Sequence, residues 1–215
     1  MQKNLPLLLL IIVLAALAVS FYHPYDQLTW FLETVPVIIG IILLLLTWRR
    51  FPLTTLLCSL LSLHALILIL GGHYTYAKVP LGFWLQDLFD FSRNHYDRIG
   101  HIAQGFIPAI LAREILLRRS PLVPGKWLFL LVTSVCLAFS AFYEMVEWWT
   151  ALFSGEAATA FLGTQGDIWD TQWDMFFAFM GAMVAQLLLS RWHNHQLVDI
   201  APDLKEKFSS AGKNK

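Results

Sequence analysis

The sequence has few charged residues. Aspartate, glutamate, lysine and arginine make up 14% of its 215 residues, whereas 57% are hydrophobic and the mean hydropathy is +0.59. Soluble domains are roughly a quarter charged and about half apolar. The shortage of charge therefore excludes an ordinary soluble protein and predicts an integral membrane protein with no room for a sizeable soluble domain. Membrane lipids are its expected partners.

The sequence also lacks an excess of either charge and lacks a set of paired cysteines. Fifteen basic residues balance fifteen acidic ones, which excludes the strongly basic composition of nucleic-acid-binding proteins, so nucleic acid is not an expected partner. Cys58 and Cys136 each lie within an apolar run, where a thiol acts as a small hydrophobic side chain. No disulfide is expected between them.

Six apolar runs approach the length of about 20 residues that a helix needs to cross a bilayer. They cover approximately residues 5–21, 29–48, 51–70, 99–117, 126–149 and 172–192. We therefore predict an all-α, polytopic membrane bundle of about six transmembrane helices in a single domain, residues 1–192. A polar, disordered cytoplasmic tail, residues 193–215, is expected to follow.

The first run could instead be a cleaved signal peptide. Ala18-Val19-Ser20 has the small residues of a signal-peptidase site. However, Lys3 is the only basic residue before the run, and further spanning runs follow. We expect the first helix to be retained, with cleavage as the alternative.

Two other segments have distinctive patterns. From Leu81 to Ser92, apolar side chains that include Trp and Phe recur at helical spacing on one side, and Gln86 and Asp87 lie on the other. This pattern predicts an amphipathic helix in the membrane interface. The fourth run contains Gly105 and Pro108, which membrane helices tolerate where neighbouring helices take up the freed backbone groups. That helix is expected to be kinked and to pack centrally.

The basic residues are unevenly distributed between the connections. With a cytoplasmic amino terminus and six spans, twelve of the fifteen fall on the cytoplasmic side and three on the outer side. This is a strong positive-inside bias, which predicts that both termini are cytoplasmic. The twelve are Lys3, Arg49, Arg50, Arg113, Arg118, Arg119, Lys126, Arg191, Lys205, Lys207, Lys213 and Lys215, and the three are Lys78, Arg93 and Arg98.

This topology places three polar stretches together on the outer side. They are residues 94–101 at the start of the fourth run, 144–147 at the end of the fifth and 166–174 at the start of the sixth. Asp97 and His101 are four residues apart and share a helical face with Gly105. We expect the stretches to converge, whereas His193 and His195 fall on the cytoplasmic side. The convergent carboxylates are Asp97, Glu144, Glu147, Asp167, Asp170 and Asp174.

So many carboxylates near lipid must be protonated, paired or bound to a cation. Mixed histidine and carboxylate ligands suit Zn²⁺, Mn²⁺ or Fe, and carboxylates alone suit Mg²⁺ or Ca²⁺. We interpret Arg98, Glu144 and Glu147 as candidate catalytic residues for hydrolysis or group transfer at a lipid or envelope head group, with a carboxylate as the base and Arg98 holding a phosphate or carboxylate. The candidate ligands of a divalent metal (Zn, Mn or Mg) are His95, Asp97, His101, Asp167, Asp170 and Asp174.

Simpler interpretations of the same residues stay open. Asp97 and Arg98 could form an interfacial ion pair, and Asp167 and Asp170 could cap the helix that follows. The protein could also be a transporter or ligand-binding protein that is gated by carboxylate protonation, or a structural partner in an envelope complex. We rank transport second to catalysis because the cytoplasmic half of the spans has few polar residues.

The same polar stretches resemble the YjdF family of bacterial inner-membrane proteins. The resemblance is carried by His95-Tyr96-Asp97-Arg98 with His101, by Glu144 with Glu147-Trp148, and by Gly166-Asp167 with Asp170-Thr171-Gln172 and Asp174. It covers nearly the whole chain, including residues 71–77. It implies a multi-pass protein of the bacterial inner membrane but no catalytic role, because the family has no established biochemical activity.

A weaker resemblance is to VanZ-like proteins. Asp97-Arg98 with His101 matches their Asp-basic-x-x-His pattern, and Glu144 and Asp170 match the start of their two other motifs. Glu147 and Asp174 stand where those proteins have glutamine and asparagine. Both differences add negative charge, which favours cation binding here over a VanZ-like role in glycopeptide resistance.

Overall fold

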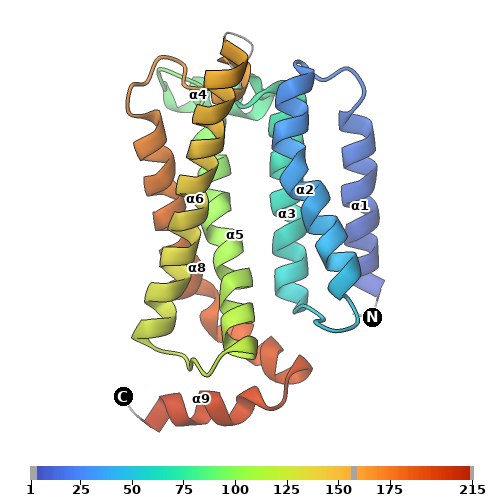
Figure 1. Cartoon of the computed structure of the whole chain (residues 1–215), viewed down its shortest axis with the longest axis vertical. Helices are drawn as coiled ribbons and strands as arrows, with labels where there is room; N and C mark the ends of the chain where they lie inside the picture. Colours follow the sequence, from blue (N-terminus) through green and yellow to red (C-terminus); the bar gives the residue numbers. More distant parts are fainter. Residues whose placement is uncertain (1–3, 156–158, 214–215) are drawn as a thin grey trace.

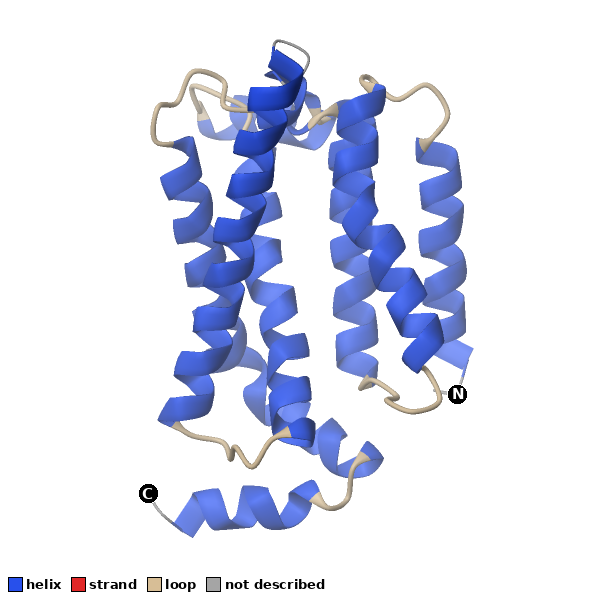
Figure 2. Cartoon of the chain, in the orientation of Figure 1, coloured by secondary structure: helices blue, strands red, loops and turns tan. Residues whose placement is uncertain are grey.

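The fold is a bundle of long helices. The computed structural model describes residues 4–155 and 159–213, which contain helices and no strands. This confirms the predicted all-α membrane bundle, and Figures 1 and 2 show the long helices side by side. The long helices are α1 (Leu5–Ser20), α2 (Gln27–Thr47), α3 (Thr55–Tyr74), α5 (Tyr96–Arg119), α6 (Lys126–Ser154) and α8 (Asp170–Ile200). The short ones are η2 (Tyr76–Lys78), α4 (Pro80–Phe89), α7 (Thr159–Leu162) and α9 (Leu204–Lys213).

The long helices differ in how readily each would cross a membrane alone. Within the described residues, α2, α3, α6 and α8 are long and apolar enough to span. Helix α1 is apolar but has 16 residues, and α5 has 24 residues but carries charged side chains inside its length. Those charges are tolerated because α5 packs against α3, α6 and α8, the central position predicted for it.

The helices begin where the chain supplies capping groups. Asp26 Oδ1 accepts the Thr29 N–H at 2.7 Å at the start of α2, and Thr54 Oγ1 accepts the Leu57 N–H at 3.3 Å at the start of α3. The third run was predicted to begin at Phe51, but α3 begins four residues later because Thr54 is its cap. Its other end continues past Gly71 to Tyr74.

Glycine residues allow α5 and α8 to approach each other closely. A Cβ atom added at Gly105 would overlap the carbonyl oxygen of Ala178, and one at Gly181 would overlap the carbonyl oxygen of Ile102. Small residues allow membrane helices to approach in this way. The close approach at these two glycines brings the polar faces of α5 and α8 together.

The two ends of the bundle have different features. Both termini lie at one end, and α4 lies across the other, where α5 and α8 begin and α6 ends (Figure 1). We call these the terminal end and the α4 end. The three polar stretches therefore share the α4 end, as the charge distribution predicted.

Helix α4 turns apolar side chains outward. Leu81, Phe83, Trp84, Leu88 and Phe89 are between 45% and 60% exposed. The helix ends before the predicted Ser92 because its next residue takes up a left-handed conformation with φ 53°. The exposed face is suited to lipid contact, in agreement with the predicted amphipathic helix.

The prediction of a disordered tail from residue 193 is wrong over the described residues. Helix α8 continues to Ile200, and α9 runs across the terminal end (Figure 1). Leu197 and Leu204 are fully or almost fully buried in the main apolar core. Lys207 Nζ donates to the carbonyl oxygens of Leu117 and Ser120 at 2.9 and 2.6 Å, where α5 ends. The polar composition of this segment gave no sign of these contacts. Because of them, residue 192 is not a boundary between the bundle and a tail.

We predict that the terminal end faces the cytoplasm, because it carries most of the basic residues. Fusions of a cytoplasm-active reporter after Arg50, Arg119 and Lys215 should all be active, and a fusion after Asp90 should be inactive. An inactive reporter at any of the first three positions, or activity after Asp90, would reverse this orientation.

Candidate functional site

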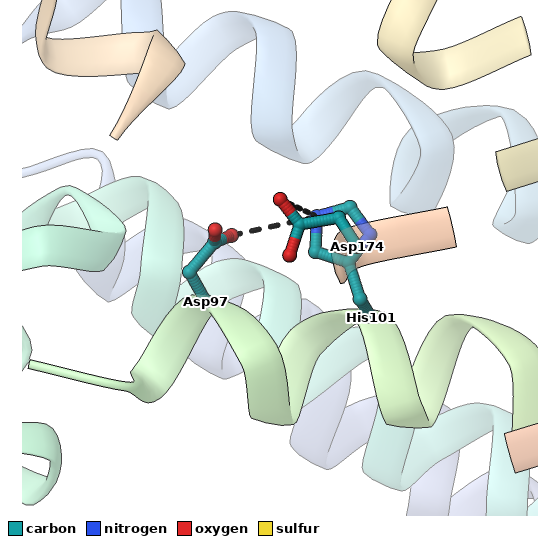
Figure 3. Close-up of side chains that lie close together, drawn as sticks. All are labelled: Asp97, His101 and Asp174. Atoms are coloured by element: carbon teal, nitrogen blue, oxygen red, sulfur yellow. Dashed lines mark ion pairs between the residues drawn. The ribbon is translucent and has the colours of Figure 1, made fainter. Parts of the chain in front are cut away.

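Five titratable side chains meet inside the α4 end. Asp97 and His101 come from α5, Glu144 and Glu147 from α6, and Asp174 from α8. His101 Nε2 lies 3.5 Å from Asp97 Oδ1, 3.9 Å from Asp174 Oδ2 and 4.0 Å from Glu144 Oε1. Figure 3 shows the carboxylates of Asp97 and Asp174 both directed toward the imidazole of His101. We call these five residues the His101 cluster.

The His101 cluster is shielded from solvent. The side chains of His101, Glu144 and Asp174 are 7%, 6% and 4% exposed, and that of Asp97 is 13% exposed. Among the described residues, Glu144 Oε1 and Asp174 Oδ1 have no hydrogen-bond partner. Burying a carboxylate oxygen without a hydrogen-bond partner costs free energy. The presence of two such oxygens in the cluster favours binding of a proton or a cation.

Gln104 orients the imidazole of His101. His101 Nδ1 lies 3.0 Å from Gln104 Oε1, on the next turn of α5. An amide oxygen accepts hydrogen bonds, so Nδ1 donates to Gln104 and Nε2 faces the carboxylates. This is the arrangement in which a histidine binds a metal through Nε2.

The spacing of the cluster fits a metal ion. Ligand atoms of Asp97, His101 and Asp174 lie within 4.8 Å of one another, as do those of His101, Glu144 and Glu147. Bonds of about 2.0–2.2 Å to one metal place neighbouring ligand atoms roughly 3 Å apart, so small side-chain rotations would close either set. One imidazole with several carboxylates suits Zn²⁺, Mn²⁺ or Fe.

Asp167 and Asp170, also predicted as ligands, lie with arginines instead. Arg98 Nη2 is 2.7 Å from Asp167 Oδ2, and Arg93 Nη1 is 2.9 Å from Asp170 Oδ1, with 3.4 Å contacts across the two pairs. The guanidinium groups balance these two carboxylates. Neither aspartate belongs to the two sets around His101, and Arg98 faces this ion-pair group.

Two loop residues have local structural contacts. Asp167 Oδ1 accepts the Trp169 N–H at 2.9 Å, in the turn before α8 and not at its first residue. This hydrogen bond, with Arg98 and Arg93, lowers the pKa of Asp167. His95 precedes α5 and packs edge-on against Phe91 at 5.0 Å. Burial and the two nearby arginines lower the pKa of His95, which lies outside both ligand sets.

Comparison with known proteins agrees with this architecture. Residues 5–195 match the family model described as "Predicted membrane protein (DUF2238)". The chain belongs to this family. Inner membrane protein YjdF of Escherichia coli (strain K12) is 54% identical over 173 residues, which cover 80% of this chain and 83% of that protein. No solved structure matches.

The match confirms the resemblance to the YjdF family. All five residues of the His101 cluster lie within the part of the chain that matches the DUF2238 family. Together with the apolar helices, the likeness to an inner membrane protein identifies the chain as an integral protein of the inner membrane. The side on which the termini lie stays a prediction.

Glu33 of α2 is a buried carboxylate that the sequence analysis missed. It is 3% exposed, and Tyr143 Oη donates to its Oε2 at 3.2 Å, linking α2 to α6. The available signal was an acidic residue inside an apolar run, which is by default a functional candidate.

A second buried polar group of this DUF2238 protein lies in the half of the bundle next to the terminal end. Glu114 Oε2 accepts from Thr54 Oγ1 at 2.9 Å and lies 3.0 Å from His193 Nε2, while Arg118 Nη1 donates to Glu114 Oε1 at 2.7 Å. Glu114 and His193 are fully buried. The cytoplasmic half of the spans was expected to have few polar residues. That expectation is wrong, because charged side chains near the end of the fourth run point into the bundle.

Proposed function

We propose that the protein binds a divalent metal ion through Asp97, His101 and Asp174. With Glu144 as proton acceptor, it would catalyse hydrolysis or group transfer at the polar head group of a lipid or envelope component. The observation that carries this proposal is the gathering of four carboxylates around one histidine, away from the arginines at the same end of the bundle.

The charge of the cluster supports cation binding. Four carboxylates face a single imidazole, and the nearest arginines, Arg93 and Arg98, are paired with Asp167 and Asp170. Buried like charges persist only when they are protonated, paired or bound to a cation. A divalent cation would balance several of them at once and could be bound by the Asp174 oxygen that has no hydrogen-bond partner among the described residues.

The remaining carboxylates support a catalytic use of that ion. A bound metal ion would supply an acidified water and polarise a phosphoryl or carbonyl oxygen. Glu144 Oε1 lies 4.0 Å from His101 Nε2 and has no hydrogen-bond partner in the described structure, so it can take up a proton beside the proposed ligands. Since the cluster lies at the end crossed by α4, its substrates would be groups at head-group depth.

The expected result is metal-dependent release of a head-group product. Protein reconstituted in bacterial polar lipid extract with Mn²⁺, Zn²⁺ or Mg²⁺ should form a new lipid product detectable by mass spectrometry, and EDTA should stop it. Glu144→Gln should lower the rate at least about 100-fold, the usual effect of losing a general base.

The matched control is Asp87→Asn, which also removes one carboxylate charge at the α4 end but changes an exposed side chain. Its rate should equal that of the wild type. The enzymatic proposal would be wrong if no metal yields a product, or if Glu144→Gln is as active as the control.

Transport of a cation, or of a solute with protons, is the second candidate. It is favoured by the buried Glu114–His193 pair, which lies in the half of the bundle opposite the His101 cluster. Between the two along α8, Gln186 Nε2 donates to Thr133 Oγ1 at 3.0 Å. Ion flux into proteoliposomes that Glu114→Gln abolishes, without any head-group product, would favour transport over catalysis.

A purely structural role explains less. The pairing of Arg93 and Arg98 with Asp167 and Asp170 would suit a structural partner in an envelope complex. It offers no partner for the carboxylates around His101.

A further inference from the structure

The half of the bundle next to the terminal end holds a buried arginine that no carboxylate within residues 4–155 and 159–213 neutralises. Arg113 of α5 is 3% exposed. Its Nη1 lies 2.8 Å from His193 Nδ1, and its Nη2 donates to Asn194 Oδ1 at 2.6 Å. No carboxylate among the described residues lies within ion-pair distance of it. Buried arginines are normally paired, so this one calls for an anion.

The hydrogen bonds define the charge of the group. A guanidinium can only donate, so His193 Nδ1 accepts from Arg113 and the histidine carries its single proton on Nε2. That proton is donated to Glu114 Oε2, 3.0 Å away. Glu114 is also paired with Arg118 at 2.7 Å. Glu114 is thus paired with Arg118 beside a neutral histidine, and the positive charge of Arg113 is left without a carboxylate among the described residues.

Arg113 also lines a groove of about 380 Å³. The groove lies where the α5–α6 connection, α6, α8 and α9 meet, at the terminal end. Arg191 adds a second, exposed positive charge to its wall. Apolar side chains line it as well, and one of them, Leu187, is 73% exposed on the outside of α8. The groove therefore joins a cationic pocket to the apolar surface of the bundle.

We propose that this groove binds the phosphate of an anionic phospholipid from the leaflet at the terminal end. A phosphodiester would give Arg113 and Arg191 the negative partner that the described part of the chain does not supply. Basic pockets between membrane helices recognise lipid head groups in this way. Free phosphate shares the head-group chemistry, but the apolar lining next to Leu187 favours a ligand with acyl chains. The proposal is independent of the His101 cluster.

The test measures lipid binding by the whole protein. In detergent, native mass spectrometry should show that the wild type retains phosphatidylglycerol in preference to phosphatidylcholine. The double variant Arg113→Gln with Arg191→Gln should retain about tenfold less phosphatidylglycerol, as expected for lost charge-assisted hydrogen bonds. The control, Arg49→Gln with Arg50→Gln, removes two exposed positive charges from the same end and should bind like the wild type.

Three outcomes would overturn the proposal. They are equal retention of the two lipids by the wild type, equal loss of phosphatidylglycerol in the two double variants, and displacement of phosphatidylglycerol by millimolar inorganic phosphate, which would assign the site to a free anion. If the Arg113 variant does not fold, Arg191→Gln alone serves, because its side chain is exposed. It should lower retention about threefold, roughly half the effect of one hydrogen bond to a charged group, and unchanged retention would contradict the proposal.

Discussion

Replacing Gly105 with leucine is expected to leave little folded protein in the membrane. The carbonyl oxygen of Ala178 occupies the space that even a Cβ atom would need, and it belongs to the backbone of α8. Overpacking costs about 1–3 kcal/mol where side chains can move aside, so a clash that only helix displacement relieves should cost more than about 3 kcal/mol. Separating α5 from α8 would also take Asp97 and His101 away from Asp174.

The control for Gly105→Leu is Gly40→Leu. Gly40 lies inside α2, and nothing is within 4 Å of a Cβ atom added there. The same substitution should therefore leave stability nearly unchanged. Yield of monodisperse protein and its thermal midpoint in detergent measure the difference, and equal behaviour of the two variants would mean that the close approach at Gly105 is not needed for folding.

Loss of one ligand should have the second large effect. Asp174→Asn keeps the size of the side chain but removes the charge that faces His101 Nε2 at 3.9 Å. We expect metal affinity to fall at least roughly 100-fold, because even changes to groups behind the ligands cost 10–100-fold. His101→Ala should cost more, since His101 belongs to both ligand sets.

Asp167→Asn is the matched control for Asp174→Asn, because it makes the same chemical change at a carboxylate that is paired with Arg98. Its metal affinity should equal that of the wild type. Calorimetric titration of EDTA-treated protein with Mn²⁺ or Zn²⁺ separates the variants, and affinity should weaken at acid pH because the ligands must be deprotonated. Weaker binding by the Asp167 variant than by the Asp174 variant would show that the proposed carboxylate ligands are wrong.

Much of the fold could be predicted because its signals are local. Apolar runs located the spanning helices, and the bias of basic residues placed the three polar stretches at one end. Helical spacing put Asp97, His101 and Gly105 on one face of α5, and this is the face that α8 approaches. These features depend on neighbours in the sequence or on counting charges.

The partner of each charged side chain could not be predicted in the same way. Asp170 and Asp174 are one turn apart on α8, yet one faces Arg93 and the other faces His101. Which of them joins the cluster depends on the position of α8 along the axis of α5, because residues one turn apart lie on the same helical face. The sequence alone leaves that position undetermined to within a turn.

Contacts between distant segments were missed for a related reason. Glu33 meets Tyr143 and Glu114 meets His193 across separations of 110 and 79 residues. The polar stretch after Trp192 looks like a tail until Leu197 and Leu204 are seen packed in the core. An ionisable residue in an apolar run is the one local sign of such contacts, and Glu33 is a residue of this kind.

The most direct test of the metal site is the metal content of the purified wild-type protein. Protein prepared without chelators from cells supplied with Zn²⁺ and Mn²⁺ should contain about one divalent ion per chain, because each ligand set centres on the single histidine His101. His101→Ala should contain almost none, and Asp167→Asn should retain the ion. No metal above background in the wild type, or the same content in the His101 variant, would contradict the account.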